Sequence, residues 1–390
     1  MIPVTSTAPY DPLIPGHVAE PFERLAIARS ECPLSTPRPR VHVVATYQDV
    51  RAALGDHARY SSRGNFTLTP DPPPVTPTVI TSLDEPEHGA LRTFLRRWFA
   101  PRELRRLEGA VNGIVNSVLA PLKPGERIDL VEVVARKVPP RVVYALVGLP
   151  EEDWAKIQAW TDSLHDHLPA MPSDLPELLM LDRYLARFLA ARRGSARQGH
   201  DDLAQGLAHD GSMSLEEATA HLRQILGAGT ATTMSLLSNL LLELLWHRDL
   251  WEQLRTDPSL IDAAVEESLR HDPPLRYVLR TVSENTEIAG CPVGRGDRLV
   301  LSLQSAGHDE NVWGEDASTF DLRRPPTTAV LTFGYGIHTC LGAPLARLEA
   351  RVLLSELLAR FPDLALVSDY AREPAREPML RRPQRLDVVL

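Results

Sequence analysis

One cysteine lies in a glycine-rich segment, Phe333-Gly-Tyr-Gly-Ile-His-Thr-Cys340-Leu-Gly, just before a predicted helix. Glycines at 334, 336 and 342 let the backbone fold closely around one side chain, and Pro344 marks the first turn of the helix. The N–H groups and dipole of a helix N-terminus favour the thiolate, which is the form of cysteine that binds metal. An isolated cysteine is usually an inert buried residue. The glycine frame instead predicts a metal ligand at Cys340.

Other cysteine chemistries fit this chain less well. A zinc site built on His338 and Cys340 needs two further ligands, and none is nearby. The C-x-x-C-H motif that attaches c-type haem is absent. Three cysteines, with no C-x-x-C pair, argue against a disulfide framework. Cys32 and Cys291 are therefore predicted to be bystanders.

The segment resembles the cysteine loop of the cytochrome P450 family, F-G-x-G-x-H-x-C-x-G, and matches it at every fixed position from Phe333 to Gly342. The resemblance implies that Cys340 is the proximal ligand of a haem b iron (iron protoporphyrin IX). A thiolate ligand pushes electron density onto the iron and favours O–O cleavage. The resemblance extends over nearly the whole chain and implies the cytochrome P450 fold in a single large domain, residues 1–390.

Two further motifs carry the resemblance. Glu267-Ser-Leu-Arg270 matches the family's E-x-x-R, and residues spaced i, i+3 on a helix are neighbours that can pair. The resemblance assigns Arg324 as the third member of this network. It also assigns the two haem propionates, which need cations or donors when buried. The residues it implies for them are His88, Arg92, Arg280 and His338.

A long apolar helix is predicted to follow Ser214-Leu-Glu-Glu, which resembles a capping box. Its midpoint carries Gly227 and Gly229 beside several threonines. Glycine costs stability inside a helix, so the helix is thinned there, either for a close approach to its backbone or for a tight helix crossing. The family has A-G-x-(D/E)-T at this place, so the resemblance puts Ala228 and Gly229 against the haem and Thr232 at the oxygen site.

Ala231 stands where the family has an acid that helps to relay protons for oxygen activation. Three compensations are open: Thr230 or Thr233 with ordered water, a polar group on the substrate, or a reaction that does not need the full relay. Thr232 and Thr233 are the candidate catalytic residues, and we hypothesise that substrate or water fills the gap left by Ala231.

Substrate contacts are predicted from two loops and one strand. The segments Ser62–Thr81 and His165–Leu175 fall where the family has the roof of its distal pocket. Strand alternation places Val278 and Arg276 on the same face as Arg280, so Arg276 is expected to point toward the substrate. A buried arginine needs an anion or several acceptors, which predicts an acidic or carbonyl-rich substrate. Pairing of Arg276 with a propionate, or exposure to solvent, is the alternative.

The elements that must position these residues are mostly helices. Apolar periodicity predicts a mainly α chain with a minor β part. The predicted helices cover Tyr47–Leu54, Glu87–Phe99, Glu103–Leu119, Ile128–Val147, two helices within Glu151–Arg193, Ser214–Trp246 and Pro258–Arg270. The predicted strands cover Val41–Ala45, Tyr277–Val282 and Arg298–Leu303.

Composition excludes several classes of function. The net charge of −9 argues against nucleic-acid binding, and 43% hydrophobic residues indicate an ordinary globular protein. Neither a signal peptide nor a membrane anchor is predicted, and the stretch Met234–Trp246 is too short to span a bilayer. We expect a cytoplasmic monomer. Exposed arginines near the predicted proximal face suggest an acidic ferredoxin as partner, reduced by a ferredoxin reductase that uses NAD(P)H. These are Arg96, Arg97, Arg102, Arg105 and Arg106.

The resemblance implies a haem-thiolate monooxygenase that inserts one atom of O2 into a small or medium organic substrate, in secondary metabolism. The same haem could instead serve oxidative coupling, desaturation or peroxide-driven oxidation, which the missing acid at position 231 favours. A third alternative is a haem protein that binds a gas without turnover. The retained Thr232 and the two predicted roof loops argue against it.

Overall fold

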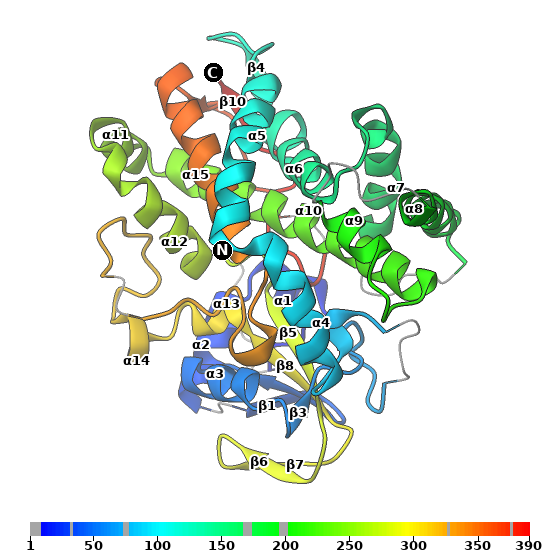
Figure 1. The fold of residues 1–390 in the computed structure, drawn as a ribbon. Coiled ribbons are helices and arrows are strands. Elements are labelled where there is room, and N and C mark those ends of the chain that lie inside the picture. The colour runs from blue at the N-terminus through cyan, green and yellow to red at the C-terminus, as the bar shows by residue number, and fades with distance from the viewer. Residues whose placement is uncertain are drawn as a thin grey trace.

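The computed structural model describes residues 9–31, 34–72, 78–166, 174–194, 202–325, 328–374 and 377–390. Helices dominate this part of the chain and small sheets are packed to one side of them, as predicted (Figure 1). Cys32 and most of the second predicted roof loop lie outside the described residues.

The α-helices are α1 (Pro15–Ala19), α2 (Phe22–Glu31), α3 (Tyr47–Gly55), α4 (Glu87–Leu95), α5 (Pro101–Leu119), α6 (Val138–Val147), α7 (Trp154–Asp166), α8 (Pro176–Gly194), α9 (Leu203–Ala208), α10 (Leu215–Trp246), α11 (Arg248–Thr256), α12 (Ile261–His271), α13 (Leu303–Ala306), α14 (Glu310–Trp313) and α15 (Ala343–Arg360). The shorter turns are η1 (Ile80–Ser82), η2 (Arg96–Phe99), η3 (Val131–Ala135), η4 (Glu151–Asp153), η5 (Pro258–Leu260) and η6 (Gly336–His338). The strands are β1 (Leu34–Arg38), β2 (Val41–Val44), β3 (Tyr60–Ser61), β4 (Arg127–Asp129), β5 (Tyr277–Val282), β6 (Thr286–Ile288), β7 (Cys291–Val293), β8 (Arg298–Ser302), β9 (Ala365–Leu366) and β10 (Asp387–Val389).

The long helix α10 crosses the middle of the molecule (Figure 1). It begins with the predicted capping box, in which Ser214 and Glu217 each bind the other's backbone N–H. The helix is long and apolar enough to cross a membrane by composition alone. Two thirds of its most apolar stretch is buried inside the protein, which identifies it as the core helix. It packs against α6 and α8, while α15 packs against α5 and α12.

The largest sheet lies beside the helices and has the strand order β1-β2-β8-β5-β3. Strands β2 and β8 are parallel and the other neighbours are antiparallel. Both faces are covered. Leu299 and Leu301 pack toward α3, whereas Tyr277, Leu279 and Val300 pack around Tyr10. Strand β5 has the predicted bounds, Tyr277–Val282.

The predicted helix Ile128–Val147 is wrong in its first half. Residues 127–129 form strand β4, which pairs with β10, and the short π-helical turn η3 follows. Helix α6 starts only at Val138, with prolines in its first turn. Pro139 and Pro140 have no backbone N–H to donate, so they are tolerated at a helix start but would break a helix that ran through them.

Candidate active site

The cysteine loop folds back on itself between α3 and α15. The Cys340 N–H donates to the Phe333 carbonyl at 2.8 Å, which closes the loop. Gly334 and Gly336 have φ of +75° and +74°, a region that side chains rarely adopt. A Cβ on Gly336 would also lie 3.0 Å from the Leu54 carbonyl oxygen of α3. These two glycines are therefore required by backbone conformation, and Gly336 also by close packing.

The Cys340 side chain is accessible, although protein surrounds most of it. Burial raises the pKa of its thiol. The N–H groups of Gly342 and Ala343 hydrogen-bond to the sulfur and act in the opposite direction, as do the charges of Arg92 and Arg347. The helix start thus lowers the thiol pKa as predicted, but burial outweighs it. Binding of a metal cation would reverse this balance, because a coordinating thiol loses its proton.

Two buried histidines lie against each other beside the cysteine loop. The rings of His88 and His338 are 4.1 Å apart between centroids. Neither ring nitrogen of His88, and not Nε2 of His338, has a hydrogen-bond partner. Burial lowers the pKa of His338 to about 3, and the charges of Arg280, His88 and Arg92 lower it further. The four candidate propionate ligands therefore lie together, as a cluster that lacks acceptors.

The two arginines of this cluster are bound only to backbone carbonyls. Arg92 donates to the Thr339 carbonyl at 2.6 Å, and Arg280 donates to the Leu279 carbonyl at 2.8 Å. Neither forms an ion pair with a carboxylate among the described residues. Burial lowers the pKa of Arg280 to about 10, which the charge of Asp84 partly offsets. A buried guanidinium of this kind calls for an anionic partner.

Helix α10 presents one accessible stripe at its midpoint. Ala228 is exposed and Thr232, one turn later, is half-buried, whereas most of the surrounding helix is buried. The Thr232 hydroxyl donates to the Ala228 carbonyl at 2.7 Å. Thr233 and Thr230 are only 5% and 4% exposed, so their hydroxyls are not on this stripe. The prediction of a catalytic Thr233 is therefore corrected, because one residue turns a helix by about 100°.

Gly229 answers the question left open by the glycine pair in α10. A Cβ at this position would lie 2.6 Å from Cγ2 of Val143 in α6. The thinning at Gly229 therefore serves a tight helix crossing, the alternative to an approach by a ligand.

The E-x-x-R helix, α12, carries a buried ion-pair network. Arg270 binds Glu267 through two nitrogens, at 2.8 and 2.6 Å. Arg324 reaches the same carboxylate at 3.1 Å. Arg270 also donates to the carbonyls of Gly307 and Ala317. The structure thus brings together the three side chains that the sequence singled out, and the network joins α12 to the segment that precedes the cysteine loop.

Arg276 does not lie where the sequence analysis expected. Its side chain is fully buried, and it donates to the carbonyls of Leu380 and Val18, near Tyr10. Strand β5 begins only at Tyr277, so the alternation of side chains does not extend to residue 276. Val278 is half-buried on the face toward α3. The argument for an acidic substrate from Arg276 is withdrawn.

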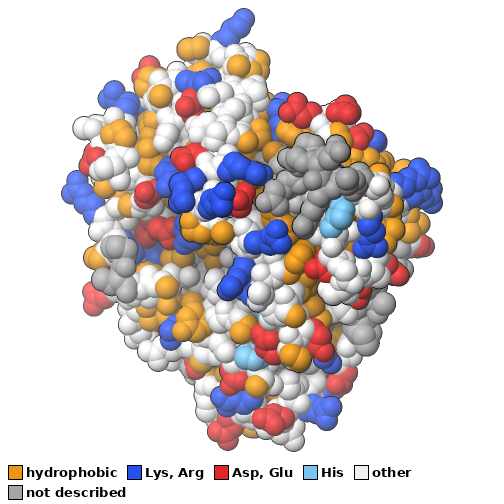
Figure 2. Space-filling view, viewed as in Figure 1, with side chains coloured by type: hydrophobic (Ala, Val, Ile, Leu, Met, Phe, Trp, Pro, Cys, Tyr) orange, Lys and Arg blue, Asp and Glu red, His pale blue; other side chains and the backbone are white. Residues whose placement is uncertain are grey.

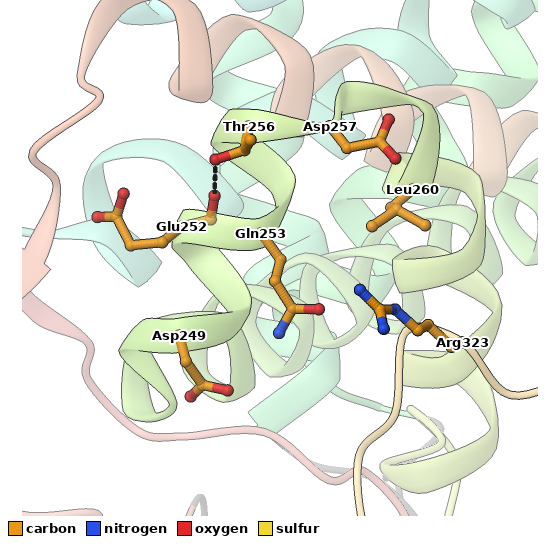
Figure 3. Close-up of a pocket in the computed structure, with 7 residues that line it drawn as sticks. All are labelled: Asp249, Glu252, Gln253, Thr256, Asp257, Leu260 and Arg323. Carbon is orange, nitrogen blue, oxygen red and sulfur yellow. Dashed lines mark hydrogen bonds between the residues drawn. The ribbon is translucent and has the colours of Figure 1, made fainter.

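A surface hollow of about 550 Å³ lies on α11 and η5 (Figure 3). Asp249, Glu252 and Asp257 line it together with Arg323, and the close-up shows their side chains on one side of these helices. None of the predicted site residues lines it, so it is separate from the cysteine loop. Figure 2 shows that Lys and Arg side chains gather near the middle of the viewed face, over the start of α5.

Comparison with known proteins gives the class. The Cytochrome P450 family model matches residues 149–388, more than half of the chain. "Erythromycin C-12 hydroxylase" of Saccharopolyspora erythraea is 35% identical and is covered over 92% of each chain. "Cytochrome P450 monooxygenase PikC" of Streptomyces venezuelae is 35% identical over 89% of this chain and 85% of its own.

Solved structures agree. CalO2 matches with a TM-score of 0.87 at 29% identity, over 98% of this chain and 99% of its own. A mutant of P450 EryK in complex with erythromycin B matches with a TM-score of 0.85 at 32% identity, over 95% and 97%. The chain belongs to the cytochrome P450 family, with the P450 fold. It is a cytochrome P450 monooxygenase, a class that works with haem, a substrate and redox partners.

The residues present fit the haem that the family implies. Cys340 offers an accessible sulfur, and beside it lie buried imidazole nitrogens without partners and two arginines without carboxylates. Haem carries two carboxylates that such a cluster would bind. The sequence analysis assigned no role to Arg347, although it lies seven residues, two helical turns, after Cys340. Its neighbour Glu266 was missed because it adjoins Glu267 in the sequence.

Proposed function

We propose that this protein tailors a secondary metabolite by inserting one oxygen atom from O2 into an organic substrate of small or medium size. The observation that carries the proposal is the cysteine loop, in which glycines, a helix start and an accessible Cys340 converge beside a cluster of unpaired cationic donors. Relatives named for erythromycin hydroxylation and polyketide biosynthesis support the substrate class.

The proposed roles follow from position. Cys340 would bind the iron of haem b, which with a thiolate ligand supplies oxygen activation. His88, Arg92, Arg280 and His338 would hold the propionates. Phe333 and Gly342 frame the loop, and Glu267, Arg270 and Arg324 hold it from behind. Ala228 and the backbone of Gly229 lie on the α10 side of the site.

Thr232 is the residue proposed to handle protons. Its hydroxyl lies on the accessible stripe of α10 and is held by the Ala228 carbonyl. With Ala231 in place of an acid, and with Thr230 and Thr233 buried, a polar group of the substrate or water is the proposed proton source. Val278 is proposed as a substrate contact.

Ala231 also favours a second function. Oxidative coupling, desaturation or peroxide-driven oxidation on the same haem needs less proton delivery. Turnover with a surrogate redox pair, followed by mass spectrometry, separates the possibilities. A gain of one oxygen atom supports monooxygenation and a loss of hydrogen supports desaturation or coupling. Absence of any product across a panel of bacterial secondary metabolites would favour gas binding without turnover.

We further propose an acidic ferredoxin with its NAD(P)H-dependent reductase as the electron source, and a monomer in the bacterial cytoplasm. Five exposed arginines at the end of α4, in η2 and at the start of α5 support the ferredoxin. Against a net charge of −9, this local positive region would attract an acidic partner.

The decisive experiment is the ferrous carbon monoxide spectrum. A thiolate ligand gives a far red-shifted Soret band, and we expect this band in the wild-type protein and its loss in Cys340→Ser. Cys291→Ser is the matched control, since Cys291 lies in the β6–β7 hairpin, and it should keep the band. Survival of the band in Cys340→Ser would exclude the proposed ligand.

A further inference from the structure

Arg347 lies against the cysteine loop from the side of α15. Its guanidinium carbon is 4.5 Å from the centroid of the Phe333 ring, within the range of a cation–π contact. The carbonyl of the same Phe333 accepts the hydrogen bond from the Cys340 N–H. A single residue therefore contacts Cys340 through its backbone and Arg347 through its ring.

Glu266 of α12 fixes the position of Arg347. Both Nε and a terminal nitrogen of Arg347 donate to the two carboxylate oxygens of Glu266, the second bond being 2.9 Å long. The side chains are 36% and 41% exposed. The bidentate pair and the planar stack restrain the guanidinium in two directions. The next residue, Glu267, binds Arg270 and Arg324 instead, so α12 holds the cysteine region through two separate carboxylates.

The charge of Arg347 acts on the cysteine. Besides Arg92, Arg347 is the arginine whose charge lowers the pKa of the Cys340 thiol. Arg92 is accounted for by its bond to the Thr339 carbonyl and its place in the propionate cluster. Arg347 lies in no part of that cluster. Its effect on the site is electrostatic, and it depends on the geometry that Glu266 and Phe333 impose.

We propose that Arg347, held by Glu266 and the Phe333 ring, is a positioning residue that raises the reduction potential of the iron bound to Cys340. The inference rests on the proposed function of Cys340. Reduction adds one negative charge to the site, so a fixed positive charge nearby favours the reduced form. The potential decides how readily a partner delivers the first electron. This gives Arg347 a role in the reaction without contact with substrate.

The same pair of helices supplies a matched control. One turn further along α15, Arg351 pairs with Asp262 of α12 at 3.5 Å. This second pair carries the same charges between the same helices, is more exposed, and has no printed contact with Phe333 or charge effect on Cys340 among the described residues. Arg347→Gln and Arg351→Gln therefore remove the same charge at two distances from the cysteine.

The experiment is a redox titration of the haem-loaded wild type and both variants, after their ferrous carbon monoxide spectra have been recorded. Arg347→Gln should make the reduction equilibrium less favourable by roughly three- to tenfold, the upper value being about 59 mV for one electron. Arg351→Gln should stay at the wild-type potential. Arg347→Lys keeps the charge but loses the stack and the bidentate pair, so a smaller shift in the same direction is expected.

Equal potentials in Arg347→Gln and wild type, or equal shifts in Arg347→Gln and Arg351→Gln, would overturn the inference. If Arg347→Gln does not retain haem, Arg347→Lys against Arg351→Lys makes the same comparison, and equal potentials there overturn it too. A wild-type protein without the thiolate spectrum would defeat the proposed function itself. A thiolate spectrum with no shift in Arg347→Gln would defeat only the role of Arg347.

Discussion

At the scale of single residues, two adjacent threonines of α10 differ in what they can do. Thr232 lies on the accessible stripe, whereas Thr233 is buried one position further around the helix. Thr232→Ala should lower the product formed per NADPH by roughly tenfold or more, because the hydroxyl that holds the proton is lost. NADPH consumption should continue. Thr233→Ala is the control and should stay near the wild-type ratio; equal losses in both variants would contradict the assignment.

Ala231 permits the complementary test. Ala231→Glu restores the type of residue that the family has at this position, at a site that is 5% exposed. If proton delivery limits the wild type, the product formed per NADPH should rise several-fold while the product stays the same. The measurement is product yield against NADPH consumed, with Ala231→Gln as the uncharged control. An unchanged ratio in Ala231→Glu would mean that substrate or water already delivers protons adequately.

A buried histidine outside the site makes stability depend on pH. Burial lowers the pKa of His308 to about 3, and its Nε2 is 2.7 Å from the His271 carbonyl. The unfolded chain therefore binds a proton between pH 6.5 and 3 that the folded chain does not. This group should remove about 2 kcal/mol of unfolding free energy between pH 7 and 5. Urea unfolding of His308→Gln should show a weaker pH dependence, whereas a variant of the exposed His247 should match wild type.

At the scale of elements, the crossing of α10 and α6 depends on the missing side chain of Gly229. Gly229→Ala would bring a methyl group to 2.6 Å from Val143, and β-branched Val143 has little freedom to move aside. The expected loss of unfolding free energy is about 1–3 kcal/mol. Val143→Ala should relieve part of it, so the double variant should be more stable than the sum of the single losses predicts. Strict additivity in urea unfolding would refute the contact.

At the scale of the whole molecule, charge is unevenly distributed. The chain has a net charge of −9, yet the arginines around the start of α5 are exposed together. Reduction by an acidic ferredoxin should slow as ionic strength rises, and Arg102, Arg105 and Arg106 all changed to Gln should remove most of that salt dependence. Stopped-flow reduction measures both. The matched control changes Arg59, Arg295 and Arg385, and an equal effect there would indicate net charge rather than docking.

Local signals in the sequence determined much of this protein. The glycine frame identified the cysteine loop, and the capping box and apolar period gave the start and course of α10, because these features act within one or two turns of chain. The spacing of E-x-x-R gave the Glu267–Arg270 pair for the same reason. The three cysteines also separated into one accessible site residue and bystanders by their neighbours in the chain alone.

Tertiary structure decided what depends on residues far apart in sequence. It turned Arg276 away from the site because β5 starts one residue later, and it assigned Gly229 to a crossing with α6. It also paired Glu266 with Arg347 across 81 positions. Side-chain direction at the end of a strand and the choice between two adjacent carboxylates depend on packing. Burial likewise outweighed the helix start at Cys340, because desolvation depends on every element around the thiol.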